Sequence, residues 1–202
     1  MLNREQAHEL LLWAHEQNPG PWLGHSLTAA RAAETLANAC GLDSKQAYLY
    51  GLLHDIGRYE GVRGMHHVIA GYELMMQKNQ PEIARICLTH SFPLPELDAY
   101  TGPQDCTPEE KLFLKEAISK IEMSAYDHLI QLCDALAMPN GISTIEERLF
   151  EGNLRHGFND YTQRKWQAFI NLKKEFDTRC GMNIYQLFRD EITQRIFGNT
   201  SK

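Results

Sequence analysis

The chain has 202 residues, of which 43% are hydrophobic and 23% are charged, and it carries a formal net charge of −6. This length favours a single domain, and this composition is typical of a water-soluble globular protein. The negative net charge argues against a surface that binds the backbone of a nucleic-acid duplex. A small anion remains a suitable partner, because metal ions and a few arginines can supply local positive potential.

The same sequence gives no sign of a membrane segment or of export. Its apolar runs are too short to cross a bilayer, and the first residues lack the basic and then apolar pattern of a signal peptide. The five cysteines are scattered and form no Cys-x-x-Cys pair, which argues against a disulfide framework and against a thiolate zinc site. We therefore expect a cytoplasmic protein without a membrane partner.

Helical spacing of apolar residues recurs along nearly the whole chain, and capping residues, prolines and glycines mark where each run begins and ends. The expected helices cover about residues 3–17, 23–40, 44–55, 66–78, 81–90, 107–120, 124–136, 144–155, 160–179 and 183–197. Residues 58–65 and 91–106 are expected to be loops, because they contain several glycines or prolines. No segment alternates convincingly with period two, so the sequence predicts an all-α fold.

One stretch near the end of an expected buried helix, Leu52 to Arg58, places an imidazole and a carboxylate side by side after an apolar run. Polar groups set against a core need partners, and a metal ion is one such partner. A plainer interpretation is a helix end, in which Gly57 is the left-handed terminator and His54 is a core histidine with satisfied hydrogen bonds. The His-Asp dipeptide alone does not decide between the two.

Further candidate ligands occur at the ends or inner faces of successive expected helices. The full set is His25, His54, Asp55, His67, His90 and Asp134. Imidazole with carboxylate and without thiolate suits iron, manganese, zinc, cobalt or nickel rather than calcium. Six such groups exceed the needs of one tetrahedral zinc ion and are enough for two metal ions that share a bridging carboxylate. Ordinary histidines without a ligand role are the alternative, since spacing alone does not prove that these residues converge.

The order of these residues resembles a known family. His25, then His54-Asp55, then Asp134 match the H…HD…D signature of HD-domain metal-dependent phosphohydrolases in order and context. The resemblance covers about residues 20–140 and implies an all-helical bundle in which these four positions bind a metal ion. Together with the length of the chain, this predicts one all-helical domain over residues 1–202, with an HD-like core at about 20–140 and C-terminal helices at about 141–202 that lie outside the resemblance.

Dinuclear members of that family supply additional histidines, and this chain resembles them as well. His67 followed by Gly71 is similar to their His-x3-Gly motif, and His90 is similar to the next histidine. The resemblance implies that Asp55 is the bridging carboxylate when a second metal ion is present. It therefore implies a cofactor of one or two divalent ions, with iron or manganese favoured and zinc, cobalt, nickel or magnesium as alternatives.

Two neighbouring residues compete with the preferred ligands. His66 adjoins His67, and only the glycine spacing favours His67. Asp127 lies two turns before Asp134 on the same helix face, where an acid near the helix start is favoured without any ligand role. We expect Asp127→Ala to keep metal and activity and to cost at most about 1 kcal/mol of stability.

Arg58 stands where some relatives have a lysine, three residues after Asp55. A guanidinium here could hold a phosphate through two hydrogen bonds, which makes Arg58 a catalytic candidate beside Asp55. A solvated arginine that caps the helix is the competing interpretation. Arg63 is a second candidate, and the loop of residues 91–106 is expected to border the substrate pocket.

The resemblance implies hydrolysis of a phosphomonoester or phosphodiester, most naturally of a nucleotide, by a water that the metal activates. The expected partner is thus a small phosphorylated molecule. Two other functions remain open: a di-iron HD-fold oxygenase, and a regulatory or ligand-binding module whose metal only holds the helices together. The sequence also leaves the oligomeric state open, a homodimer included.

Overall fold

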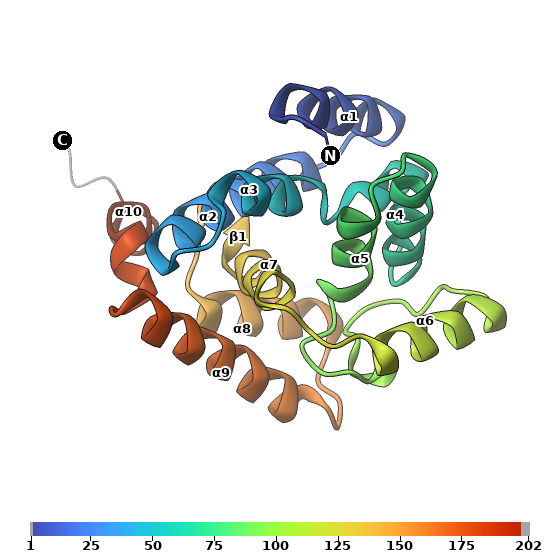
Figure 1. Cartoon of the computed structure of the whole chain (residues 1–202). Helices are drawn as coiled ribbons and strands as arrows, with labels where there is room; N and C mark the ends of the chain where they lie inside the picture. Colours follow the sequence, from blue (N-terminus) through green and yellow to red (C-terminus); the bar gives the residue numbers. More distant parts are fainter. Residues whose placement is uncertain (1, 199–202) are drawn as a thin grey trace.

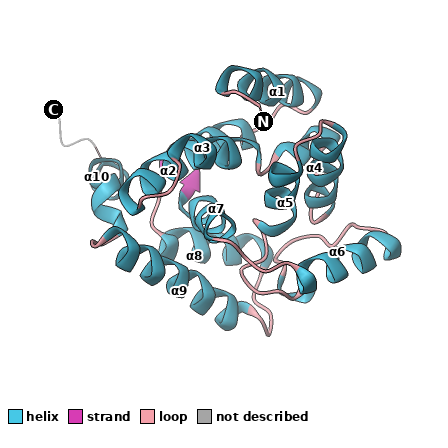
Figure 2. Ribbon diagram, in the orientation of Figure 1, coloured by secondary structure: helices cyan, strands magenta, loops and turns pink. Residues whose placement is uncertain are grey.

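The computed structural model describes residues 2–198, and nearly all of their regular structure is helical (Figures 1 and 2). The helices are α1 (Arg4–Gln17), α2 (Trp22–Cys40), α3 (Ser44–Leu53), α4 (His66–Gln77), α5 (Pro81–Thr89), α6 (Pro108–Lys120), α7 (Ala125–Leu136), α8 (Ile145–His156), α9 (Thr162–Cys180) and α10 (Arg189–Phe197). Three short 3₁₀ helices are η1 (Ile56–Glu60), η2 (Leu97–Ala99) and η3 (Ile184–Phe188), and two strands, β1 (Ala137–Met138) and β2 (Gly141–Ile142), form a hairpin. The predicted all-α class is confirmed.

The helix ends follow local sequence signals. Asn3, Thr107 and Ser124 each close a capping box at a helix start, where the side chain accepts from a backbone N–H that has no partner inside the helix. Gly41 and Gly181 end α2 and α9 in the left-handed conformation, which costs glycine little because it has no Cβ. These signals explain why most helix boundaries agree with the sequence-based expectations.

Helix α7 lies in the middle of the bundle, and it packs against α2, α3, α5, α8 and α9 (Figure 1). Its buried apolar residues belong to the main core, which also contains Leu36 of α2, Leu52 of α3 and Phe176 of α9. A smaller apolar cluster under α6 includes Met65, Leu88 and Phe92. The central position of α7 means that α2, α3 and α5 all face it.

The structure differs from the expectations at four places, one of which is the short 3₁₀ helix η2 (Leu97–Ala99) inside the expected loop of residues 91–106. Pro139-Asn140-Gly141 does not simply stop α7 but turns a hairpin that pairs Ala137 with Ile142. Its strands are two residues long, too short for an alternating pattern to show. Residues 58–65 are not all loop, because η1 extends to Glu60. The helix expected at 183–197 is divided into η3 and α10.

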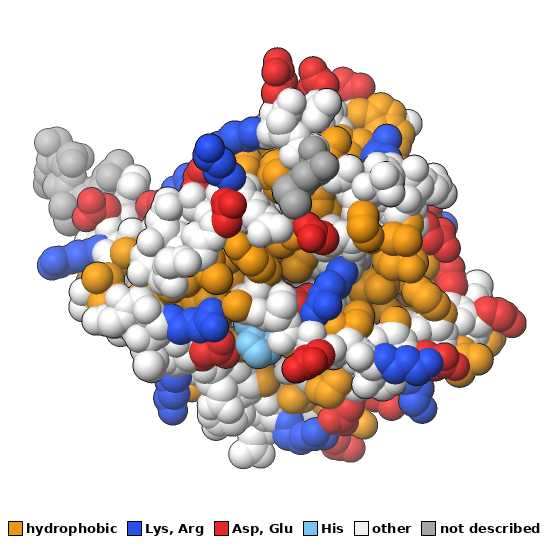
Figure 3. Space-filling model, viewed as in Figure 1, with side chains coloured by type: hydrophobic (Ala, Val, Ile, Leu, Met, Phe, Trp, Pro, Cys, Tyr) orange, Lys and Arg blue, Asp and Glu red, His pale blue; other side chains and the backbone are white. Residues whose placement is uncertain are grey.

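The surface in Figure 3 carries basic and acidic side chains interspersed with apolar patches. That face therefore shows no broad field of one sign, in keeping with the net negative charge of the chain. Within residues 2–198, none of the helices is both long and apolar enough to span a membrane.

Candidate metal centre

The six predicted ligands converge from five helices. His25 lies in the first turn of α2, His54 ends α3, Asp55 follows it, His67 lies in the first turn of α4, His90 ends α5, and Asp134 lies in the last turn of α7. All except Asp134 are buried, and the side chain of Asp134 is 24% exposed. Residues far apart in sequence thus meet in one place, as groups able to bind metal ions.

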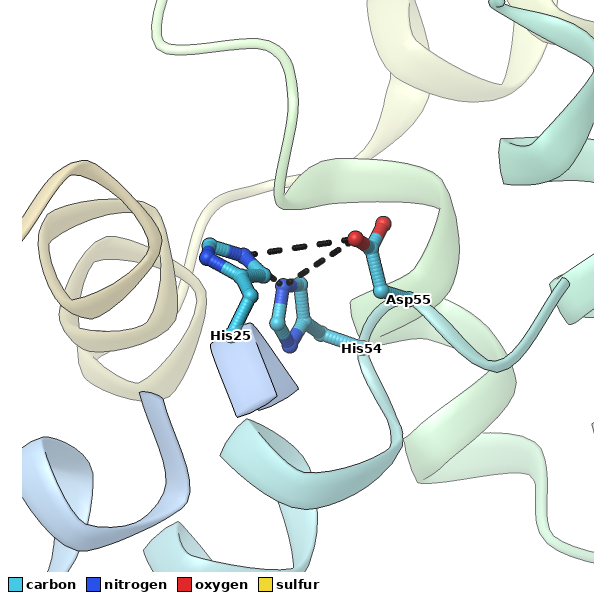
Figure 4. Close-up of side chains that lie close together, drawn as sticks. All are labelled: His25, His54 and Asp55. Carbon is cyan, nitrogen blue, oxygen red and sulfur yellow. Dashed lines mark hydrogen bonds and ion pairs between the residues drawn. The ribbon is translucent and has the colours of Figure 1, made fainter. Parts of the chain in front are cut away.

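The first half of the cluster contains His25, His54 and Asp134 with one oxygen of Asp55. The Nε2 atoms of His25 and His54 lie 3.2 Å apart, and Asp134 Oδ1 lies 3.0 Å from Nε2 of His25. Asp55 Oδ2 lies 4.0 Å from both of these Nε2 atoms. Figure 4 shows the rings of His25 and His54 directed toward the Asp55 carboxylate.

The second half contains His67, His90 and the other oxygen of Asp55. The Nε2 atoms of the two histidines lie 3.2 Å apart. Asp55 Oδ1 lies 3.1 Å from Nε2 of His67 and 3.4 Å from Nε2 of His90. The carboxylate of Asp55 therefore lies between two pairs of imidazoles and presents one oxygen to each.

Each of the four imidazoles is also held in place through its Nδ1 atom. The four Nδ1 atoms lie 2.5–3.1 Å from backbone carbonyl oxygens, which only accept hydrogen bonds; these oxygens belong to Ala137 for His25, Gly51 for His54, Gly64 for His67 and Cys87 for His90. The proton of each neutral ring is therefore on Nδ1, and each Nε2 presents a lone pair. This second contact is the one that typically orients a metal-binding histidine.

The donor set fits a cation. Two Nε2 lone pairs that face each other at 3.2 Å have no proton between them. In addition, Oδ1 of Asp55 is buried and accepts no hydrogen bond from any described residue. Buried lone pairs without donors are costly unless a cation satisfies them. The cluster is thus consistent with one or two divalent ions.

The protonation states suit the same role. Burial lowers the pKa of His54 to about 4, so its ring is neutral near pH 7. Burial on its own would raise the pKa of Asp55, but Arg58 and the surrounding imidazoles hold that pKa well below its ordinary value. For Asp134, burial on its own would also raise the pKa, but the contact with His25 and the nearby His54 and His90 together lower the pKa of the carboxyl. Neutral imidazoles and ionised carboxylates are the forms that bind metal.

Arg58 does not cap a helix. Its Nε donates a hydrogen bond to Oδ2 of Asp55, and its side chain is partly exposed to a cavity. Gly57 is likewise no left-handed terminator, because its φ angle is not positive. A Cβ at Gly57 would lie 2.0 Å from the carbonyl oxygen of His67 and 2.4 Å from the backbone nitrogen of Gly71. Glycine is needed at this position because η1 and α4 touch through their backbones.

A cavity of about 750 Å³ opens over the cluster. His25, Asp55, His90 and Asp134 contribute to its inner surface. Its lining also includes Arg58 and Arg63, together with residues 91 and 100–103. The loop of residues 91–106 thus borders the cavity, as its position after His90 indicated.

The two competing residues lie outside the cluster. His66 contacts Glu60 through Nε2 at 2.9 Å and Glu110 through Nδ1 at 3.2 Å. Asp127 is fully buried and accepts hydrogen bonds from Arg85, Thr89 and Ser124. The small stability cost expected for replacing Asp127 is therefore too low, because it considered only the helix dipole and not these buried contacts.

Sequence reasoning missed the basic residues that α8 and α9 place on the cavity wall. These residues are Arg148, Arg155 and Lys165. In the sequence they resemble ordinary surface charges on amphipathic helices, and no spacing rule connects them to the histidines. Only the docking of α8 and α9 against α7 brings them to the cavity.

The fold and the cluster together define a helical protein with a buried His/Asp metal-binding centre. The HD domain family model matches residues 22–138, more than half of the chain. The chain belongs to the HD domain family.

Among curated proteins, the chain is 40% identical over 63 residues to Ribonuclease Y of Lactobacillus acidophilus. The match covers 30% of this chain and 11% of that protein, so the chain spans only a small part of the relative. None of the solved structures compared with the chain gives a match.

Proposed function

We propose that this protein is a metal-dependent phosphohydrolase that cleaves a phosphomonoester or phosphodiester of a small molecule, with a nucleotide as the substrate class. One observation carries the proposal: the Asp55 carboxylate lies between two imidazole pairs at the inner end of a cavity. Such a centre needs no protein nucleophile, because a water can attack phosphorus when cations offset the charge.

The candidate ligands form two sets, one for each proposed metal ion. His25, His54 and Asp134 would hold one divalent ion, the second histidine pair would hold another, and Asp55 would bridge the two. We propose iron or manganese as the metal, and zinc, cobalt, nickel or magnesium is an alternative that these ligands also accept. When bound, the ions would lower the pKa of a coordinated water and offset the charge of the phosphoryl group. The Nδ1 contacts to backbone carbonyls keep the rings in place for this role.

We assign Arg58, beside Asp55, the role of binding the phosphoryl group of the substrate. It adjoins Asp55 and lies on the cavity surface, where its guanidinium can bind phosphoryl oxygens of the substrate. Its charge also keeps Asp55 ionised, because a nearby cation lowers the pKa of a carboxyl group. Asp55 and Arg58 are therefore the proposed catalytic pair.

Two further observations favour a nucleotide. A cavity of about 750 Å³ has the size that binds a small organic molecule rather than a duplex. The partial likeness to a ribonuclease supports a phosphate ester of a nucleotide. Because that match is short, the identity of the phosphate ester is a proposal and not a result of the comparison.

The test uses protein purified without chelator and loaded with iron or manganese. Phosphate release from nucleoside monophosphates, cleavage of bis(p-nitrophenyl) phosphate and oxygen consumption are measured in parallel. We expect hydrolysis in the first or second assay, and we expect Asp55→Asn to lose it. Asp160→Asn is the control and should keep the activity, because Asp160 is exposed and is not one of the candidate ligands. Oxygen consumption without hydrolysis would identify an oxygenase, and inactivity of the metal-loaded protein in all assays would favour a structural role for the metal.

A further inference from the structure

Part of the cavity wall comes from α8 and α9, outside the range that matches the HD domain model. Arg148 and Arg155 on α8 and Lys165 on α9 line it. Glu151 is the acidic residue of the same wall. Three cations thus face one carboxylate, and the wall has a surplus of positive charge.

Lys165 is half-buried yet has no charged partner of its own. Its Nζ donates a hydrogen bond to Oγ1 of Thr101 at 3.1 Å, and within the described part of the chain it forms no ion pair. Burial lowers the pKa of its ammonium to about 8, only partly offset by the more distant Asp134. A desolvated ammonium beside a neutral hydroxyl is stabilised by an anion that enters the cavity.

Arg148 is in a similar position. Its Nε is buried and has no hydrogen-bond acceptor among the described residues. Its nearest carboxylate is Glu151, at 3.9 Å from Nη1, and Arg155 lies at the same distance from the same oxygen. One carboxylate at this separation does not satisfy two guanidinium groups.

The acids of the metal centre do not balance this charge. Asp55 is paired with Arg58, and both Asp55 and Asp134 belong to the proposed ligand set, where the positive charge of bound metal ions would offset these carboxylates. The wall therefore retains about two positive charges beyond those of the centre, which equals the charge of one phosphate group near neutral pH. Guanidinium and ammonium groups are also the side chains that commonly bind phosphate.

We propose that Arg148 and Lys165 bind a second phosphate group of the substrate, separate from the one that is hydrolysed, so that the preferred substrate is a nucleotide with two separate phosphates. This inference rests on the proposed function for the identity of the reacting group. It assigns the C-terminal helices a direct part in substrate selection, with Lys165 and Arg148 as the specificity-determining residues.

The experiment compares adenosine 5′-monophosphate with adenosine 3′,5′-bisphosphate on the metal-loaded protein. We expect kcat/KM for the bisphosphate to exceed that for the monophosphate at least tenfold. Lys165→Gln and Arg148→Gln should each lower the bisphosphate value about tenfold and leave the monophosphate value within about twofold. Lys174→Gln, on the exposed face of the same helix as Lys165, is the matched control and should change neither.

Binding measured by calorimetry separates this inference from the proposed function. One possible result is that neither nucleotide is hydrolysed, but the bisphosphate binds more tightly than the monophosphate and loses that advantage in Lys165→Gln. This result would support the second phosphate site and would contradict the proposed hydrolase activity. If both nucleotides lose affinity or rate equally in the variants, or if the bisphosphate has no advantage, the second phosphate site is wrong. Inorganic phosphate is the third probe: an equal loss of its affinity in Lys165→Gln, without a bisphosphate advantage, would mean a site for free anions and would overturn the inference.

Discussion

At the scale of the residue, Asp55 connects the two halves of the candidate metal centre. Its two oxygens face different imidazole pairs, and its neighbour Arg58 holds the carboxylate in its ionised form. Burial of a lone carboxylate would be costly, so these partners are the reason why the position tolerates an acid. The same requirement distinguishes Asp134, which has His25 beside it, from Asp127, which has its own partners elsewhere.

The first prediction compares the two acids on α7. We expect Asp134→Ala to lose the ion held with His25 and His54, because Asp134 Oδ1 lies 3.0 Å from Nε2 of His25. Asp127→Ala should keep its metal, because all hydrogen bonds to Asp127 come from Arg85, Thr89 and Ser124 rather than from the cluster. Elemental analysis of the two purified variants decides the matter. Loss of metal in Asp127→Ala alone would reverse the assignment.

The second prediction concerns stability. Asp127→Ala removes a buried acceptor shared by Arg85, Thr89 and Ser124, so we expect a loss of about 3 kcal/mol in the free energy of unfolding. Burial would raise the pKa of Asp127, but the bonds from Arg85 and Ser124 lower it below its ordinary value. The carboxylate therefore stabilises the fold above the unfolded-state pKa of about 3.9, and this contribution disappears as the pH falls through the lower folded-state value.

Urea unfolding of the wild type and Asp127→Ala measures this effect. The difference in stability should be the same at about pH 7 and pH 5 and should shrink below about pH 4. A difference that grows on acidification would contradict a lowered pKa for Asp127 in the folded state. A negligible difference at neutral pH would mean that the buried contacts of Asp127 do not stabilise the fold.

At the scale of the element, close backbone contacts place the ligands. Helix α4 rests on η1 at Gly57, and Gly71 of α4 lies against Cys87 of α5, whose Cβ and Sγ would be 3.1 Å from an added Cβ. Since η1 follows Asp55, α4 carries His67 and α5 precedes His90, these contacts set the spacing of the second half of the centre. Gly71, first noticed only through its spacing after His67, thus has a packing role.

The third prediction follows from that contact. Gly57→Ala should lose about 3 kcal/mol of stability and part of its metal, because the added methyl would push α4 and His67 away from Asp55. Gly152→Ala in α8 is the control: an added Cβ there meets no atom within 4 Å, and helical alanine is favoured over glycine by about 1 kcal/mol. Thermal unfolding and metal content are measured for both. Normal metal content and stability in Gly57→Ala would show that η1 and α4 can separate without harm.

The extent to which sequence predicts these elements depends on how local their causes are. Caps such as Asn3 and Ser124 act within one turn, so helix boundaries could be predicted from neighbouring residues. The hairpin at 137–142 could not, because its two-residue strands form through the tertiary position of α7 and the turn after it. The 3₁₀ geometry after Asp55 likewise depends on the contact of Gly57 with α4.

At the scale of the whole molecule, the metal centre and the cavity wall have different origins. The order of histidines and aspartates carried enough information to predict which residues converge, because the family signature preserves their order along the helices. The wall of Arg148 and Lys165 could not be predicted, since its position depends on how α8 and α9 dock on the core. The structure thus adds the part of the cavity that lies beyond the matched residues 22–138.

The last prediction concerns how many ions the assembled bundle holds. We expect two per chain after anaerobic purification with metal supplied, because each oxygen of Asp55 faces its own imidazole pair. His67→Ala should retain the ion at His25 and His54, whereas Asp55→Ala should lose both, because it removes the carboxylate shared by the two halves. Each loss should also lower the melting temperature toward that of the metal-free protein, since bound ions stabilise the folded state. If the wild type holds one ion and His67→Ala keeps it, the centre is mononuclear, and the pair of His67 and His90 has another role.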